Sequence, residues 1–208
     1  MIILFQEVRK EPVLLSERID FESGVWTNVP VRAVRVESGY LVEAQAYSDA
    51  WRYTSYGFLH DTEHGLLRPL SRDSSVEVTF RCELTEQFDQ AGILIRHDGS
   101  HWIKAGVEFV DGYAQVGAVV THEFSDWSVA PVDDWLGKEV TIRASWSGDA
   151  VTIRAKAEGE DFRLVRVAHW SQDFHTQAGP MLCSPTRGGF STHFTTWISG
   201  PSDGSLHA

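Results

Sequence analysis

The dipeptide Asp111-Gly112 constrains this chain more than any other feature, because it stands between two runs of alternating apolar residues. A type I′ turn needs positive φ at both central residues, and Asp-Gly is among the pairs that supply it most readily. The sequence therefore predicts a β-hairpin with strands over residues 102–110 and 113–122. This turn also sets which residues of the two strands face each other.

A third strand over residues 90–96 extends this hairpin if the loop His97–His101 turns the chain back. A slip of one residue would move every side chain to the other face, so the apolar pattern tests the register. In the predicted register one face is wholly apolar and carries Ala91, Ile93, Ile95, Ile103, Ala105, Val107, Val116, Ala118 and Val120. The opposite face is mixed and carries Gln90, Gly92, Leu94, Arg96, Trp102, Lys104, Gly106, Glu108, Gln115, Gly117, Val119 and Thr121. We expect the first face to be core.

Three glycines, Gly92, Gly106 and Gly117, fall in one row across the mixed face. Glycine weakens a strand, so an aligned row suggests that something bulky or flat lies against the backbone there. We interpret the row as a trough for a ligand, bordered by Gln90, Glu108 and Gln115 on one side and by Arg96, Trp102 and Lys104 on the other. The alternative is that an aromatic side chain of the protein itself, such as Trp51 or Tyr53, packs on the glycines.

Helical periodicity is nearly absent from the rest of the chain, where short alternating runs are separated by Gly, Asp, Ser and Pro. This pattern is typical of a β-sandwich or barrel. Strands are predicted near residues 13–15, 31–36, 40–46, 52–58, 76–82, 90–96, 102–110, 113–122, 139–146, 150–157, 163–169, 177–183 and 190–198. We expect an all-β sandwich as a single domain over residues 1–198, followed by a flexible tail over 199–208.

The formal net charge is -11 and there is no run of Lys or Arg, so nucleic acid and membrane surfaces are not expected partners. The N-terminal residues lack a basic region before their apolar run, and no apolar run reaches the length of a membrane span. We therefore expect a cytoplasmic protein in which Cys82 and Cys183 are reduced and buried. No cofactor is expected.

Six motifs in chain order resemble a family of unknown-function domains in the concanavalin A-like lectin/glucanase superfamily, one branch of which is labelled "regulation of enolase". The motifs are W-R-Y-T-S-Y-G-F (51–58), D-x-x-H-G (61–65), D-Q-A-G-I-L-I-R-x-D (89–98), W-I-K-A-G-V-E-F-x-D-G (102–112), V-V-T-x-x-x-S-D-W-S (119–128) and C-S-P-x-x-G-G-F (183–190). The resemblance covers roughly residues 20–198. It implies a jelly-roll sandwich of two curved antiparallel sheets whose concave face often binds sugars, and it implies no particular reaction.

Glu108 is the best candidate for acid or base catalysis, because it points from the mixed face toward the trough. Glycoside hydrolysis needs two carboxyl groups across the scissile bond. The E-x-D-x-E strand motif of related glucanases is absent, and only Asp89 and Asp126 at strand ends could approach Glu108. The alternative is that Glu108 forms a structural ion pair with Lys104 or Arg96.

Two further groups of reactive side chains are weaker candidates. His60 and His64 flank carboxylates in a spacing that could bind a metal on a helix, but Gly57 and Gly65 indicate a loop whose histidines bond to backbone. Cys183 could be a nucleophile if His169 or His193 lay close, and otherwise it is a small buried hydrophobic residue.

Binding explains the same residues more simply, because sugars present apolar ring faces edged by hydroxyls. The predicted ligand-binding residues are Trp51, Tyr53, Gln90, Arg96, Trp102, Lys104, Glu108, Gln115, Asp126 and Trp127. Our leading hypothesis is a lectin-like domain that binds a carbohydrate or sugar phosphate on its concave face. The alternatives are a glycoside hydrolase or polysaccharide lyase that uses Glu108, and a protein-interaction module that regulates a metabolic enzyme such as enolase.

Overall fold

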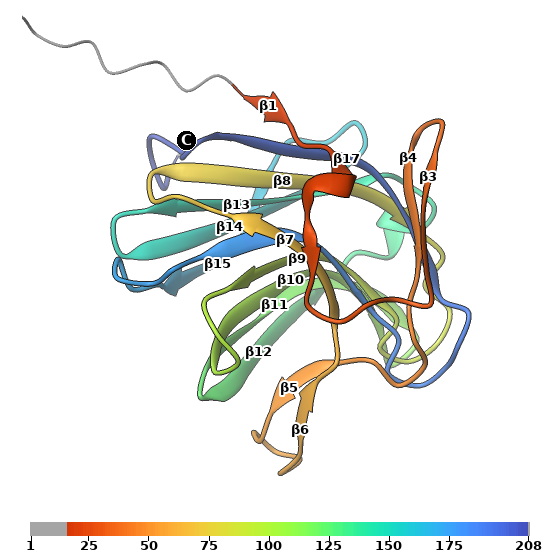
Figure 1. Ribbon diagram of the computed structural model, residues 1–208. Helices are drawn as coiled ribbons and strands as arrows, with labels where there is room; N and C mark the ends of the chain where they lie inside the picture. Colours follow the sequence, from red (N-terminus) through yellow and green to blue (C-terminus); the bar gives the residue numbers. More distant parts are fainter. Residues whose placement is uncertain (1–15, 208) are drawn as a thin grey trace, which may run out of the picture.

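Two large antiparallel β-sheets lie face to face in the computed structural model, which describes residues 16–207 (Figure 1). The strand expected at 13–15 lies outside the described residues, as does Ala208. The helical content of the described chain is two short 3-10 turns, η1 (Phe21–Ser23) and η2 (Asp133–Trp135). No helix in this part of the chain is long and apolar enough to cross a membrane. The prediction of an all-β sandwich is confirmed.

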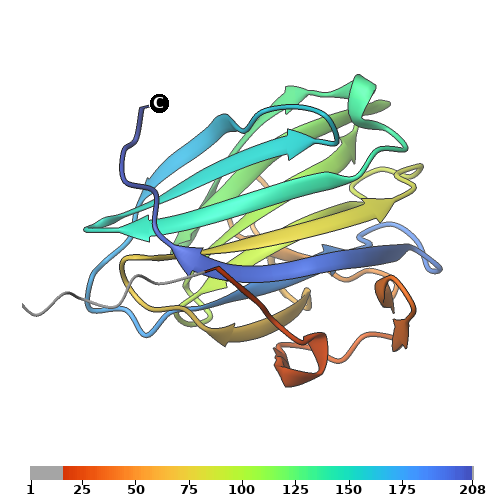
Figure 2. The same ribbon diagram turned by 90° about the horizontal axis from the view of Figure 1, so that it is seen from above.

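The first sheet has eight strands and forms the upper layer of Figure 1, seen face-on in Figure 2. Its strands are β1 (Glu17–Arg18), β3 (Arg32–Val36), β4 (Gly39–Glu43), β8 (Ser74–Cys82), β13 (Val140–Ser147), β14 (Ala150–Ala157), β15 (Arg163–His169) and β17 (Ser191–Pro201). They lie in the order β15-β14-β13-β8-β17-β4-β3, with β1 beside β17.

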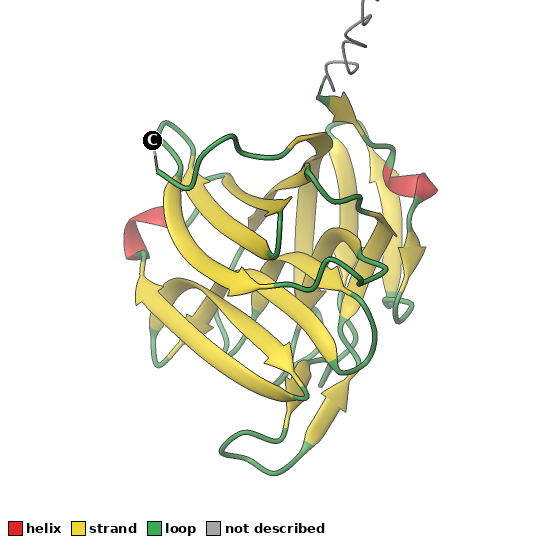
Figure 3. Cartoon of the chain, turned by 90° about the vertical axis from the view of Figure 1, so that its left-hand side faces the viewer, coloured by secondary structure: helices red, strands yellow, loops and turns green. Residues whose placement is uncertain are grey.

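The second sheet has seven strands and carries the functional candidates. Its strands are β2 (Val25–Trp26), β7 (His64–Pro69), β9 (Gln90–Arg96), β10 (His101–Val110), β11 (Tyr113–His122), β12 (Phe124–Pro131) and β16 (Gln177–Cys183). They lie in the order β12-β11-β10-β9-β16-β7-β2. A separate hairpin of β5 (Ala50–Arg52) and β6 (Leu59–Asp61) projects below this sheet, as Figures 1 and 3 show.

The core lies between the two sheets and follows from alternation along the strands. Strand β14, with the sequence AVTIRAKA, alternates between half-buried and buried residues over its whole length. Its inward residues Val151, Ile153 and Ala155 are fully buried in the main hydrophobic cluster. Removing apolar surface from water stabilises a folded protein by about 25 cal/mol per Å². The buried face between the sheets is therefore the main source of stability.

The predicted register of β9, β10 and β11 is confirmed residue by residue. Val110 pairs with Tyr113 and Gly106 pairs with Gly117, while Glu108 pairs with Gln90 on its other side. All nine residues of the predicted apolar face lie in the main core cluster between the sheets. The mixed face is turned away from the other sheet, and we call it the outer face.

The glycine row has a different cause from the one predicted. A Cβ on Gly92 would lie 2.0 Å from the Ala105 carbonyl oxygen, and one on Gly106 would lie 2.1 Å from that of Ala91. The backbone of the neighbouring strand therefore occupies the space that a side chain would need. The cavity beside Gly106 and Gly117 holds about 20 Å³, too little for a sugar, so the interpretation of the row as an open ligand trough is wrong.

The alternative for the glycine row, filling by Trp51 or Tyr53, is also wrong. Neither residue lines the small space over the glycines. Trp51 packs in a second buried cluster on the outer face, made of Ala50, Trp51, Leu67, Leu94, Trp102, Val119, Met181 and Cys183. Tyr53 is exposed in the turn that joins β5 to β6.

Two other strand predictions need correction. The strand expected at 52–58 ends at Arg52, and the following tip turns with φ of 59° at Tyr53 and 61° at Ser55. The expected end of the domain at residue 198 falls inside β17, which continues to Pro201. Beyond it Asp203 forms ion pairs with Arg143 and Arg154, so part of the predicted flexible tail is held on the first sheet.

Candidate functional site

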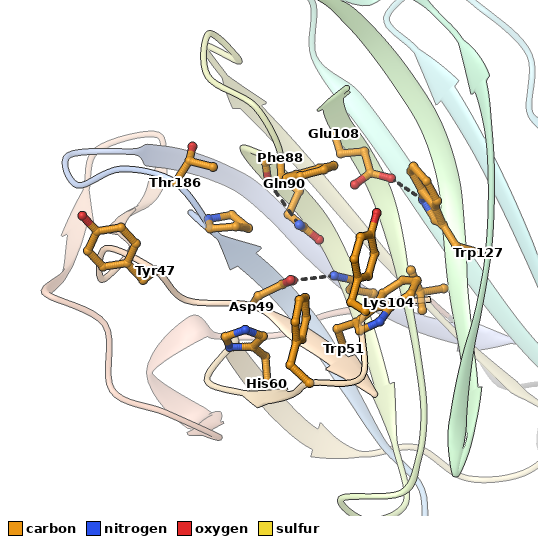
Figure 4. A pocket seen from close by; sticks show the side chains of 14 residues that line it. Tyr47, Asp49, Trp51, His60, Phe88, Gln90, Lys104, Glu108, Trp127 and Thr186 are labelled. Atoms are coloured by element: carbon orange, nitrogen blue, oxygen red, sulfur yellow. Dashed lines mark hydrogen bonds and ion pairs between the residues drawn. The ribbon is translucent and has the colours of Figure 1, made fainter. Parts of the chain in front are cut away.

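A cavity of about 390 Å³ lies on the outer face, between the second sheet and the β5–β6 hairpin (Figure 4). Its size is within the range of small-molecule sites. We call it the pocket, and its lining residues are Tyr47, Asp49, Trp51, Tyr56, Phe58, His60, Phe88, Gln90, Lys104, Glu108, Val119, Trp127, Pro185 and Thr186. They come from several strands and loops that are distant in sequence.

A buried ion pair forms the floor of the pocket. Lys104 on β10 is 5% exposed, and its Nζ lies 2.8 Å from Oδ1 of Asp49 in the loop before β5. Burial lowers the pKa of Lys104, but the nearby acidic groups, Asp49 first and Glu108 among them, together outweigh that effect and raise the pKa. Lys104 is therefore protonated and already paired.

Glu108 also faces the pocket, and it lies on β10 on the same face of the strand as Lys104. One of its carboxylate oxygens accepts a 2.6 Å hydrogen bond from the indole Nε1 of Trp127. Burial raises the pKa of Glu108, against the opposing effects of Lys104 and of this hydrogen bond. Beside it, the buried Gln90 donates from Nε2 to the carbonyl of Phe88. The expected ion pair of Glu108 with Lys104 or Arg96 does not form, because both cations bind other carboxylates.

Aromatic side chains make the walls of the pocket. Tyr56 and Phe58 stack at the hairpin tip with their ring centroids 5.3 Å apart, and Tyr56 also meets Trp51 edge-on. Trp127 on β12 stands near Glu108 in Figure 4 and is 37% exposed. Partly exposed aromatic rings beside carboxylate and amide groups can stack on an apolar ring face and bond its polar edge.

Backbone strain gathers around this site. Tyr47, Tyr53 and Phe88 have φ of 65°, 59° and 66°, which is uncommon for bulky residues. Tyr47 and Phe88 line the pocket, and Tyr53 begins the loop that carries Tyr56 and Phe58. Such conformations cost of order 1–3 kcal/mol each and cluster at ligand-binding sites. Three of the seven non-glycine residues with positive φ in the described chain therefore lie in or next to the pocket.

Five of the ten predicted ligand-binding residues meet in the pocket, namely Trp51, Gln90, Lys104, Glu108 and Trp127. The other five do not line it, so their assignment to this site is corrected. Trp102 is buried in the cluster behind it, Arg96 pairs with Asp61 and Glu63, and Asp126 pairs with Arg166. Gln115 donates to the carbonyl of Val110, and Tyr53 packs near Phe124.

His60 and His64 are separated by the fold. His60 faces the pocket, whereas His64 is buried and both of its ring nitrogens contact backbone. Its Nε2 accepts from the N–H of Gln45, and its Nδ1 lies 2.9 Å from the carbonyl oxygen of Asn28. The alternative of histidines bonded to backbone is thus correct for His64. Over residues 16–207 there is no cluster of three potential metal ligands.

The hypothesis of a Cys183 nucleophile is wrong. Cys183 is free and fully buried, and burial raises the pKa of its thiol well above the usual range. His193 lies on β17 of the other sheet and His169 at the end of β15, so neither serves Cys183 as a base. The side chain of Cys82 lies outside the described part of the structure.

The suggested carboxylate partners of Glu108 also lie elsewhere. Asp89 is fully buried and receives hydrogen bonds from Arg187, and Asp126 is paired with Arg166 on β15. The second carboxylate of the pocket is Asp49, which is held by Lys104. Asp89, Asp126 and Asp49 are thus each held by a cation, and none of them is free to act with Glu108.

Sequence reasoning missed nine residues of the pocket, which are Tyr47, Asp49, Tyr56, Phe58, His60 as a ligand contact, Phe88, Val119, Pro185 and Thr186. Tyr56 and Phe58 lie in the motif W-R-Y-T-S-Y-G-F, and Pro185 lies in C-S-P-x-x-G-G-F. These motifs were the available signal. Alternation had placed Val119 on the mixed face. It could not place Tyr56, Phe58 or Pro185, because they lie outside the strands.

The fold and the pocket together define an all-β sandwich domain of two antiparallel sheets with a cavity on its outer face. The chain belongs to the family described as protein of unknown function DUF1349, whose model matches residues 26–201. "Regulation of enolase protein 1" of Saccharomyces cerevisiae is 32% identical over 193 residues, which are 92% of this chain and 97% of that protein.

Solved structures with the same fold include a functionally unknown protein from Saccharomyces cerevisiae, with a TM-score of 0.81 and 31% identity over 89% of this chain and 100% of that one. A xylan beta-1,4-xylosidase from Bacillus halodurans C-125 has a TM-score of 0.63 and 14% identity, over 95% of this chain and 41% of the xylosidase chain. The xylosidase likeness shows the fold alone.

Proposed function

We propose that this domain is lectin-like and binds a carbohydrate in the pocket without strong catalysis. The observation that carries the proposal is that partly exposed aromatic rings and hydrogen-bonding groups converge on one cavity. Tyr56 and Trp127 are the partly exposed rings and the buried Trp51 lies in the wall, while Gln90 and Glu108 offer polar atoms beside them. This combination suits a sugar, which has apolar ring faces and a hydroxyl edge.

The charge of the pocket favours a sugar without phosphate over a sugar phosphate. Among the described lining residues, Asp49 and Glu108 carry negative charge and Lys104 is the sole Lys or Arg. Lys104 is already paired with Asp49, so a phosphate would meet the uncompensated carboxylate of Glu108. Like charges in a partly desolvated site repel, which disfavours a phosphorylated ligand.

A glycan array followed by isothermal titration calorimetry tests this proposal. We expect one or more neutral sugars to bind, Trp127→Ala to weaken binding at least tenfold, and the 6-phosphate of a bound hexose to bind more weakly than the hexose. Phe124→Ala is the matched control, because Phe124 is 61% exposed and does not line the pocket. Absence of binding to all sugars on the array would refute the proposal.

A second candidate function is a protein-interaction module, and an exposed apolar surface next to the pocket favours it. Tyr53 and Phe124 are exposed with ring centroids 5.8 Å apart, and Leu59 on β6 is 48% exposed. The name of the yeast relative refers to enolase. If such a partner docks here, purified enolase will bind the domain, and Tyr53→Ser with Phe124→Ser will abolish that binding.

A further inference from the structure

Glu108 forms no ion pair with a cation in the described structure, and this imbalance points to the class of ligand. Its hydrogen-bond partner is the neutral indole N–H of Trp127, at 2.6 Å. The nearest cation of the pocket, Lys104, is held 2.8 Å from Asp49. With Asp49 and Lys104 compensating each other, the described lining residues leave one excess negative charge at Glu108.

The surroundings of Glu108 suit a positively charged group. Ammonium groups are attracted to the faces of Trp, Tyr and Phe, and the pocket is walled by Trp51, Tyr56, Phe58, Phe88 and Trp127. A carboxylate also accepts a stronger hydrogen bond from an ammonium than from a hydroxyl, because both partners are charged. The same group would therefore be held by Glu108 and by the aromatic rings.

We propose that the pocket selects a sugar that carries a protonated amine, with the ammonium group bonded to the free lone pairs of Glu108. This inference rests on the proposed function and names its ligand class. The sugar ring lies between Trp127 and the hairpin rings, and its hydroxyls reach the polar groups of Gln90 and Asp49. A simple quaternary ammonium such as choline has no N–H to donate to Glu108 and only one hydroxyl for Gln90 and Asp49 together.

Calorimetric titration of the full chain with glucose, glucosamine, N-acetylglucosamine and choline tests this proposal. We expect glucosamine to bind at least tenfold more tightly than glucose, a difference of about 1.4 kcal/mol. N-acetylglucosamine should behave like glucose, because acetylation removes the positive charge. Adding salt should weaken glucosamine more than glucose, since screening acts on charged pairs.

The variant Glu108→Gln isolates the charge. Glutamine keeps the shape and still accepts from Trp127, so we expect the ratio of glucosamine to glucose affinity to fall to near one. Glu37→Gln is the matched control, because Glu37 is exposed and does not line the pocket, and it should keep the wild-type ratio. Near-ultraviolet circular dichroism checks that both variants fold.

The possible failures are distinguishable. Glucosamine binding no tighter than glucose would overturn the amine selection and leave the carbohydrate proposal standing. Choline binding more tightly than glucosamine would overturn the assignment to a sugar amine. If none of the sugars binds and choline does, the proposed function itself fails. A wild-type preference that survives in Glu108→Gln would place the ammonium elsewhere.

Discussion

The two faces of strands β9, β10 and β11 use the same backbone for opposite purposes. The core face is purely apolar, and residues such as Ile93, Ile103 and Ala118 are buried against the other sheet. The outer face carries Lys104 and Glu108 in a pocket roofed by a separate hairpin. The first face stabilises the fold, and the second keeps buried charges that cost stability.

This difference teaches where to look for function in a sandwich of this kind. Charged groups are buried only when they are paired or needed, because their desolvation is expensive. Beyond the pocket, the outer face also buries Glu63, which pairs with Arg96 while its second carboxylate oxygen has no partner in the described structure. Four predictions test the contrast between the faces, from the largest expected effect to the smallest.

Gly106→Ala should have the largest effect, although Gly106 lies on the outer face. The new Cβ would lie 2.1 Å from the carbonyl oxygen of Ala91, a backbone atom that cannot move without separating β9 from β10. We expect a loss of more than about 4 kcal/mol of unfolding free energy or no soluble protein. Chemical denaturation measures this loss. Gly204→Ala is the control, since nothing lies within 4 Å of a Cβ at that position. If Gly106→Ala lost no more unfolding free energy than Gly204→Ala, the close approach of β9 and β10 would not explain the glycine row.

Ile103→Ala tests the core face. Ile103 is fully buried in the main cluster, so removing three carbons should cost about 2–5 kcal/mol. Below the unfolding transition the variant should bind pocket ligands as the wild type does, because its side chain points to the other sheet. Urea denaturation and calorimetric titration check the two halves of this prediction. A large change in ligand affinity would show that the faces are not independent.

Glu63→Gln tests the charge buried on the outer face. Burial raises the pKa of Glu63 from 4.5 to about 7, although Arg96 opposes the shift. Between these values the folded state holds more protons than the unfolded state, so the wild type loses stability as the pH rises from about 4.5 to about 7. The variant lacks this titration, and its stability relative to wild type should rise by roughly 3 kcal/mol across that window.

The unfolding free energies of wild type and Glu63→Gln, measured at pH values from about 4.5 to about 8, test this prediction. The difference between the two proteins should change with pH as Glu63 loses its proton. The control is Glu37→Gln, because Glu37 is exposed. Asp98→Asn would be unsuitable, because Asp98 pairs with His101. A difference between wild type and Glu63→Gln that does not vary with pH would contradict the prediction.

Trp127→Phe should have the smallest effect on stability. Trp127 is 37% exposed, so we expect a change below about 1 kcal/mol. The variant removes the indole N–H that donates to Glu108, and the pKa of that carboxyl should rise further above its usual range. Carboxyl NMR titration measures this shift. A Glu108 pKa that stays the same or falls would show that the hydrogen bond does not stabilise the ionised form.

The sequence predicted the central strands better than the rest of the chain. The Asp111-Gly112 turn has φ of 53° and 88°, as a type I′ hairpin requires, and the register that follows from it is correct through three strands. By contrast, residues 52–58 were predicted as a strand and are mostly a strained loop after Arg52. This segment's bulky aromatic residues have high strand propensity, and the tertiary structure overrode it.

Half of the predicted ligand-binding residues line the pocket, because alternation identifies the face of a strand on which a residue lies but not what covers that face. Gln90, Lys104 and Glu108 share a face by alternation, so counting along the strands was enough to bring them together. Arg96 and Trp102 share that face as well, but contacts with Glu63 and with the buried cluster remove them from the pocket. Face membership is a property of the strand, whereas access to a cavity depends on what covers the face.

By itself, the sequence determined the all-β class, the register around one hairpin and the direction in which Glu108 points. These follow from a period of two along a strand and from the φ values of one turn, which are local properties. The tertiary structure alone decided that Asp49 pairs with Lys104, that Glu108 bonds Trp127 and forms no ion pair in the described structure, and that the hairpin rings line the pocket. Those contacts join segments distant in sequence, and no local periodicity records them.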